Sequence, residues 1–101
     1  MMGFRFLDEA AGELEEAARH YEAVSLHLSL GLRDEVSRAL QYLLEFPKAS
    51  KPAGRAHRSY KLRRFPYLLI HRIEDAGLVI VAIAHTARKP GYWRGRDPGK
   101  E

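Results

Sequence analysis

The spacing of apolar residues predicts helices in the first half of the chain. Gly3 to Leu7 alternates apolar and polar side chains, which is typical of a short strand. Apolar residues then recur at steps of three and four, as on one face of an amphipathic helix, with Asp8 as the expected N-cap and Gly31 as the expected end. A second helix is predicted from about Leu32 to Phe46, because Pro47 disfavours helical backbone in the residue before it. The side chains expected on the buried faces are Ala11, Leu14, Ala18, Tyr21 and Leu28 in the first helix and Val36, Ala39, Leu40, Leu43 and Leu44 in the second.

The second half has the pattern of strands separated by turns. After a loop at residues 48–54, the sequence Arg58 to Arg63 alternates, and Pro66 to Ile73 is rich in Tyr, Leu and Ile. A turn at residues 74–77, expected to be an exposed hairpin tip, leads to Leu78 to His85, whose unbroken apolar run is typical of a central strand buried on both faces.

The order strand–helix–helix–strand–strand–strand predicts an α+β domain. An antiparallel helical hairpin is expected to pack on a small, mostly antiparallel sheet. With 101 residues the chain is long enough for one such domain, expected over residues 1–96, with residues 97–101 as a mobile tail.

Composition excludes several classes of protein. Without Cys, the chain has no disulfide scaffold, no thiolate metal site and no Cys nucleophile. The five His residues are scattered along the sequence, so we expect no metal site and no cofactor. The longest apolar run, residues 78–84, is too short to cross a bilayer, and the first residues lack an apolar signal core. A soluble, cytoplasmic protein is therefore expected.

Charge is distributed unevenly between the two halves. Residues 1–46 contain four Lys and Arg against nine Asp and Glu, a net charge of −5, whereas residues 47–101 contain thirteen against four, a net charge of +9. A basic half beside an acidic half is typical of a protein that binds a nucleic acid or an acidic protein. The alternative is an uneven solvated surface that binds no partner.

The basic half also holds the side chains best suited to an anionic partner. Cations contact phosphates and aromatic rings stack on bases, and the two types alternate near the C-terminus. A hydrophobic lid over the sheet edge is the other interpretation of Tyr92 and Trp93, and both interpretations stay open. Lys61 and Arg63 are expected on one face of a strand. The candidate phosphate- or partner-binding residues are Lys61, Arg63, Arg64, Arg88, Trp93 and Arg96.

Several short motifs, in this order, resemble the toxins of the RelE/ParE superfamily. They are Ala10-x-x-Glu13-Leu14-x-x-Ala17, Tyr21-Glu22, Phe65-Pro66-Tyr67, the run Ile-Ala-His-Thr-Ala-Arg-Lys-Pro at 83–90 and Tyr92-Trp93-x-x-Arg96. The resemblance covers roughly residues 4–96. It implies the toxin half of a type II toxin–antitoxin module, a class associated with growth arrest and plasmid stabilization, held inactive by a cognate antitoxin.

RelE-like members of the superfamily cleave mRNA on the ribosome, and resemblance to them implies a metal-independent endoribonuclease. The RNA 2′-hydroxyl attacks the adjacent phosphate, and cations stabilise the developing negative charge. In this chain His85 or Tyr92 would be the catalytic residue that transfers a proton, while Lys61, Arg63 and Arg88 would hold phosphate.

The match to the RelE pattern is incomplete. The stretch Tyr60-Lys61-Leu62-Arg63 resembles its Tyr-Lys-x-Lys sequence, with Arg in place of the second Lys. The next strand should supply an Arg, but Tyr67 is the nearest equivalent, and the spacing from Arg88 to Tyr92 is shorter than in RelE.

ParE-like members poison DNA gyrase, are not themselves enzymes and have a longer helical hairpin. The two long predicted helices favour this branch, with the RelE-like ribonuclease as the alternative and a non-toxic nucleic-acid-binding module as a third possibility. For either toxin we expect an acidic antitoxin segment that folds on binding, as a helix or a strand along the sheet edge and across the hairpin. Arg63 and Arg88 are expected to attract it.

Overall fold

The computed structural model describes residues 3–96 and confirms the predicted α+β architecture and element order. The tail predicted at residues 97–101 lies outside the described residues. A short 3-10 helix and a two-residue strand occupy much of the region predicted as a loop at 48–54. The elements are β1 (Gly3–Phe6), α1 (Asp8–Glu22), α2 (Leu26–Glu45), η1 (Pro47–Ala49), β2 (Lys51–Pro52), β3 (Arg58–Lys61), β4 (Tyr67–Glu74) and β5 (Gly77–His85).

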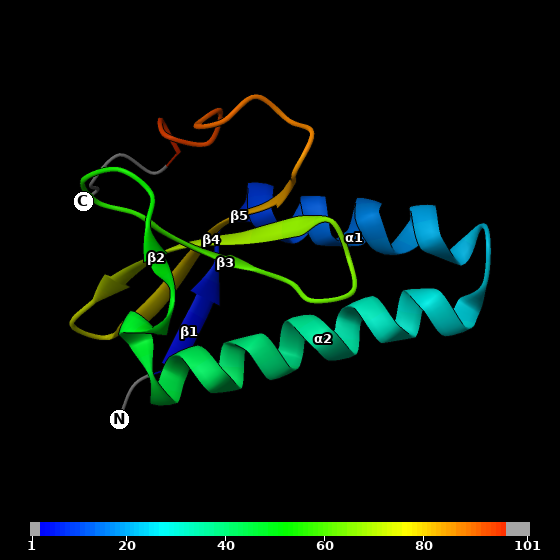
Figure 1. Ribbon diagram of the computed structural model, residues 1–101, viewed down its shortest axis with the longest axis horizontal. Coiled ribbons are helices and arrows are strands. Elements are labelled where there is room, and N and C mark those ends of the chain that lie inside the picture. The colour runs from blue at the N-terminus through cyan, green and yellow to red at the C-terminus, as the bar shows by residue number, and fades with distance from the viewer. Residues whose placement is uncertain (1–2, 97–101) are drawn as a thin grey trace.

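The strands of the described chain form one sheet in the order β1-β5-β4-β3-β2. β1 runs parallel to β5, and the other neighbouring pairs are antiparallel, which confirms the mostly antiparallel prediction. The helices α1 and α2 run antiparallel to each other beside the sheet (Figure 1). No helix within residues 3–96 is long and apolar enough to cross a membrane.

The helical hairpin buries its apolar stripe against one face of the sheet. Ala18, Val36, Ala39, Leu40 and Leu43 are buried there as predicted, and Leu14, Tyr21 and Leu44 pack half-buried at the margin of this core. Ala11 and Leu28 are exposed, so their predicted burial is wrong. The helix breaks between Glu22 and Leu26, and residue 28 therefore follows the phase of α2 rather than that of α1.

The opposite face of the sheet is covered as well. Leu78 to Ala84 in β5 are each at most 3% exposed, which confirms a central strand buried on both faces. The chain after β5 turns back across the sheet (Figure 1), and Trp93 packs in this second core against residues that include Ile70 and Val81.

The predicted boundaries of the first helix are wrong at both ends. Leu7 occupies the N-cap position and Asp8 is the first helical residue, with no side-chain cap. Gly31 does not end a helix, because Ser25 caps a new one at Leu26 by accepting the His27 N–H at 3.1 Å. Gly31 lies inside α2, where a Cβ atom would stand 3.4 Å from the Arg64 guanidinium. Its small size leaves room for the loop that follows β3.

A buried histidine on β4 binds Ser50, the residue between η1 and β2. His71 is fully buried, and its Nδ1 lies 3.0 Å from the Leu69 carbonyl, which can only accept, so Nδ1 carries the proton. Nε2 then accepts from the Ser50 hydroxyl at 3.0 Å, while Arg58 Nε donates to the same oxygen at 3.2 Å. Burial lowers the pKa of His71, and the charge of Arg58 adds to that effect.

Candidate functional site

The segment after β5 is anchored to the helical hairpin by one carboxylate. Glu13, on α1, accepts hydrogen bonds from the Tyr92 hydroxyl at 2.6 Å and from the two terminal nitrogens of Arg96 at 2.9 Å each. It also accepts the backbone N–H of Ile83 at 3.0 Å. We call Glu13, Tyr92 and Arg96 the Glu13 cluster.

The Glu13 cluster lies where β5 extends past β1. The last residue pair between these strands is Phe6 with Ile80, so farther along this edge β5 has no neighbouring strand among residues 3–96. Beyond that pair, Ile83 donates its N–H to Glu13, and the Val81 carbonyl accepts a hydrogen bond from Arg96 at 3.0 Å. Because buried backbone groups need hydrogen-bond partners, the cluster completes the sheet edge.

Electrostatics in the cluster favour a carboxylate, a neutral phenol and a guanidinium. Burial acts to raise the pKa of Glu13, but the hydrogen bonds from Arg96, Tyr92 and the Ile83 amide outweigh it and lower the pKa below its usual value. Burial and the hydrogen bond to Glu13 raise the pKa of Tyr92 to about 12. The hydrogen bond to Glu13 likewise raises the pKa of Arg96.

Two predicted cations flank the ring of Tyr92. The Arg88 guanidinium carbon lies 3.9 Å from the ring centroid and that of Arg96 lies 5.1 Å from it, within cation–π distance. The structure therefore brings Arg88, Tyr92 and Arg96 together, as the sequence motif suggests, but it gathers them around an internal acid.

Trp93 packs over the second core, on the sheet face opposite the helices, as the hydrophobic-lid interpretation expects. Its side chain is 5% exposed in the second core, and its ring lies 4.7 Å from that of His57. Partner binding by Trp93 stays a prediction, since little of its surface is accessible in this conformation.

The basic residue at the end of β3 also makes internal contacts. Lys61 Nζ donates to the carbonyls of Leu62 at 2.6 Å and Phe65 at 3.0 Å. β3 ends at Lys61, so Arg63 lies in the following loop, and the prediction that Lys61 and Arg63 share a strand face is wrong.

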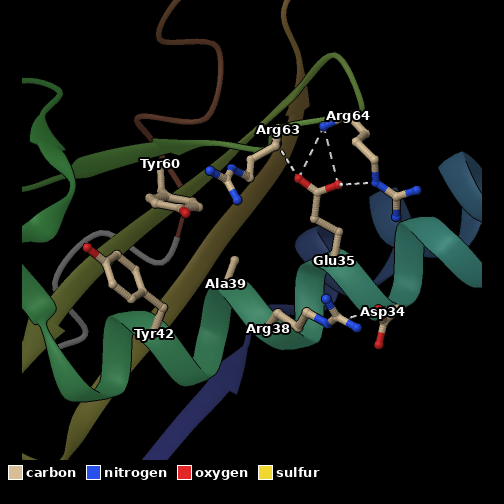
Figure 2. A pocket seen from close by; sticks show the side chains of 8 residues that line it. All are labelled: Asp34, Glu35, Arg38, Ala39, Tyr42, Tyr60, Arg63 and Arg64. Carbon is tan, nitrogen blue, oxygen red and sulfur yellow. Dashed lines mark hydrogen bonds and ion pairs between the residues drawn. The ribbon is translucent and has the colours of Figure 1, made fainter.

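Glu35 on α2 organises this loop. It accepts the backbone N–H groups of Arg63 and Arg64 and pairs with the Arg64 guanidinium at 3.4 Å (Figure 2). The guanidinium of Arg64 also reaches the Gly31 carbonyl at 3.4 Å. The loop is therefore fixed to α2 through main-chain contacts and one ion pair.

His85 borders a cleft of about 320 Å³ at the end of β5. Its Nδ1 accepts the Ala87 N–H at 3.0 Å, and its ring packs edge-on against Tyr67, with ring centroids 5.1 Å apart. Burial raises the pKa of Tyr67. Two carboxylates stand beside these groups, since the cleft is lined by residues that include Glu13, Glu16, His20, Tyr67, His85 and Arg88.

Within residues 3–96, no group of three or more His, Asp or Glu side chains is arranged to hold a metal ion.

The sequence prediction missed Glu13 as the organising residue of the site. A signal was present, because Glu13 lies three residues after Ala10 and four before Ala17, both of which are buried. This spacing places Glu13 on the sheet-facing side of α1, where a carboxylate needs donors.

Two comparisons with known proteins agree with this architecture. A family model described as the ParE toxin of the type II toxin–antitoxin system, parDE, matches residues 4–90. A solved structure titled "Chromosomal ParDE TA system from P. aeruginosa" is similar in fold, with a TM-score of 0.73 and 20% sequence identity over 84% of this chain and 96% of that chain. No curated protein matches the sequence.

The family match at residues 4–90 covers all the strands and helices described above except Gly3, the first residue of β1. The structural neighbour shares the same fold over nearly its whole length. The resemblance to the RelE/ParE superfamily is thereby confirmed, and the chain belongs to the ParE toxin family of type II toxin–antitoxin systems.

Proposed function

We propose that this toxin arrests bacterial growth by inhibiting DNA gyrase and that a cognate antitoxin neutralises it by binding. Membership of the ParE family supports a toxin with an antitoxin partner. Gyrase is the target that the ParE-like branch implies, and ribosome-dependent mRNA cleavage is the rival activity.

One observation carries the choice of gyrase over mRNA: side chains that a ribonuclease would use are committed to internal contacts. A general acid or base works best when its pKa lies near the working pH, whereas the pKa of Tyr92 is about 12 and its proton is donated to Glu13. Lys61 donates to two carbonyl oxygens. Both groups would have to leave these partners before they could act on RNA.

The cleft beside His85 is also poorly suited to a phosphate. Arg88 would attract an anion there, but Glu13 and Glu16 line the same cleft. Glu13 is already paired with Arg96, but the carboxylate of Glu16 would repel an RNA backbone that entered the cleft. His85 and Arg88 alone do not make the cation-rich site that the reaction needs.

The test measures both activities with the same purified protein. We expect inhibition of plasmid supercoiling by gyrase, no cleavage of ribosome-bound mRNA, and relief of gyrase inhibition by the antitoxin encoded in the neighbouring open reading frame. The His85→Ala variant should inhibit gyrase as well as the wild type. Message cleavage without gyrase inhibition, abolished by His85→Ala, would overturn the proposal in favour of the ribonuclease.

A further inference from the structure

The guanidinium of Arg94 reaches from the segment after β5 to the loop between β2 and β3, where the two segments approach each other (Figure 1). A Cβ atom at Gly54 in that loop would stand 3.8 Å from Arg94 Nε. The Arg94 guanidinium carbon also lies 5.6 Å from the ring centroid of Trp93, within cation–π distance. The rings of Trp93 and His57 are 4.7 Å apart, which joins the same two segments. Packing therefore sets the position of this cation.

Arg94 has no acceptor for its donors within residues 3–96. Its side chain is exposed, and its guanidinium makes no hydrogen bond or ion pair there, whereas that of Arg96 pairs with Glu13. Burial lowers the pKa of His57, and the charges of Arg72 and Arg94 add to that effect. A guanidinium offers five N–H donors in a planar fork that fits the oxygens of a phosphate. The fold thus orders such a fork and leaves it open to an anion.

The surrounding chain adds positive charge and no acid. Residues 46–73 and 76–96, which include both segments, contain no Asp or Glu. Arg55 is exposed and directly follows Gly54, the glycine beside the Arg94 guanidinium. Its guanidinium also lacks a hydrogen bond or ion pair among the described residues. Two uncompensated guanidinium groups therefore belong to neighbouring positions on this surface.

A third exposed cation, Lys51, lies on the same side of the sheet. It is paired with Ser59 across β2 and β3, and Ser59 is paired with Ile70 across β3 and β4. Directly opposed residues in an antiparallel ladder point to the same face. Lys51 therefore faces the side on which Ile70 and Trp93 pack in the second core. We call Lys51, Arg55 and Arg94 the Arg94 patch.

The Arg94 patch lacks exposed rings on which unpaired bases could stack. Trp93 is only 5% exposed, and Tyr92 donates its hydroxyl to Glu13 while Arg88 covers its ring at 3.9 Å. Proteins hold single-stranded nucleic acids largely by stacking bases on aromatic side chains. A duplex keeps its bases stacked on one another and presents its phosphates outward, so the patch fits a duplex better than a single strand.

The patch also differs from a surface that binds an acidic protein. The large apolar residues exposed within residues 3–96 all lie outside residues 51–57 and 88–96. Protein interfaces are centred on apolar or aromatic side chains, which this surface does not offer. The patch residues lie on loops and a two-residue strand, with no helix to enter a groove and contact base edges. Contact with the phosphate backbone alone remains, and such contact carries no sequence information.

From these features we propose that the Arg94 patch binds the phosphate backbone of duplex DNA without regard to sequence. Arg94 donates to the oxygens of one phosphate, and Arg55 and Lys51 contact neighbouring phosphates. The inference goes beyond the proposed function, because this binding requires neither gyrase nor the antitoxin.

The first experiment measures binding of the purified toxin to a fluorescent duplex of about two helical turns, by anisotropy at several salt concentrations. Three phosphate contacts predict that the logarithm of the binding constant falls with the logarithm of salt concentration with a slope of about −2.7. Arg94→Ala or Arg55→Ala should reduce the steepness of this slope by about 0.9. Each should weaken binding about tenfold at about 50 mM salt and only about twofold at about 500 mM.

The matched control is Arg63→Ala. The guanidinium of Arg63 likewise has no hydrogen bond or ion pair among residues 3–96, but Arg63 follows the opposite end of β3 from the β2–β3 loop. We expect this variant to keep the wild-type slope and affinity.

Three results would overturn the proposal while leaving the proposed function intact. The first is no binding of the duplex by the wild type at about 50 mM salt, where phosphate contacts are strong. The second is a wild-type slope in both Arg94→Ala and Arg55→Ala, which would place the contact elsewhere. The third is tighter binding of the single strand than of the duplex of the same sequence.

A second measurement reports on the position of the DNA without any substitution. Trp93 is the only Trp in the chain, and its ring lies beneath the Arg94 guanidinium. We expect the emission of Trp93 to change as duplex is added, over the same concentrations at which anisotropy rises. Unchanged emission at saturating DNA would exclude binding at Arg94.

Discussion

Replacing Glu13 with Ala tests whether one carboxylate holds the segment after β5 on the sheet. The substitution removes four hydrogen bonds and leaves Arg96, whose side chain is 17% exposed, without its acid. Breaking a buried ion pair by removing one partner costs about 3–5 kcal/mol. Because Glu13 and Arg96 keep 15% and 17% side-chain exposure, we expect a value near the lower end, about 3 kcal/mol.

Urea denaturation measures this effect directly. With a denaturant slope of about 1.5 kcal/mol per molar for a chain of this size, the midpoint should fall by about 2 M. The control is Glu15→Ala, since Glu15 makes the same bidentate contact with Arg33 at 2.8 and 3.0 Å, but with side chains 54% and 42% exposed. Exposed pairs contribute little, so the control should barely move the midpoint.

The effect of pH gives an independent check on Glu13. The pKa of Glu13 is lower in the folded protein than its ordinary value of 4.5. Above pH 4.5 the carboxylate therefore makes its full contribution to the free energy of unfolding, and this contribution is lost as the pH falls through the lower folded pKa. The difference in free energy of unfolding between the wild type and Glu13→Ala should therefore become smaller at acidic pH. Equal midpoints for Glu13→Ala and Glu15→Ala at neutral pH would refute the claim that Glu13 anchors this segment.

Three further variants probe the core, the phenol and the buried histidine. Leu40→Ala should cost about 2–5 kcal/mol in a urea titration, since Leu40 is 3% exposed, and an unchanged midpoint would contradict its burial. Tyr92→Phe should cost about 1.5–3 kcal/mol at neutral pH through loss of a hydrogen bond to a carboxylate. The same variant should also abolish a phenol titration near pH 12 in ultraviolet absorbance, and finding all phenols titrating near 10 in the wild type would argue against the bond to Glu13. The pKa of His71 is lowered from 6.5 in the folded protein, so wild-type stability should decline as the pH falls below 6.5, where the unfolded chain binds more protons. His71→Gln should flatten that decline when unfolding is followed at several pH values, whereas an identical slope would show that His71 is not its source.

The fold was predictable where one local pattern had a single structural solution. The apolar run of β5 is typical of a strand buried on both faces, and Pro47 limits α2 to residues before it. Gly31 was misleading because its small size matters for packing against Arg64 rather than for ending a helix. β2, with two residues, is too short to leave a periodic signal.

The candidate site was only partly predictable, because its chemistry depends on contacts between distant residues. Charge and aromatic content identify Arg88, Tyr92 and Arg96 correctly as neighbours, but not their partner. Glu13 is separated from Ile83 by 70 residues and from Arg96 by 83, and no local pattern reports such a contact. Once it forms, Tyr92 changes from a candidate acid into a fixed hydrogen-bond donor.

The most direct test of the central claim, that this protein is an antitoxin-controlled toxin, is a count of viable bacteria after induced expression. We expect colony numbers to fall when the chain is expressed alone and to recover when the neighbouring open reading frame is coexpressed. Unimpaired growth with the folded protein present at high level would contradict the account and favour a non-toxic nucleic-acid-binding module.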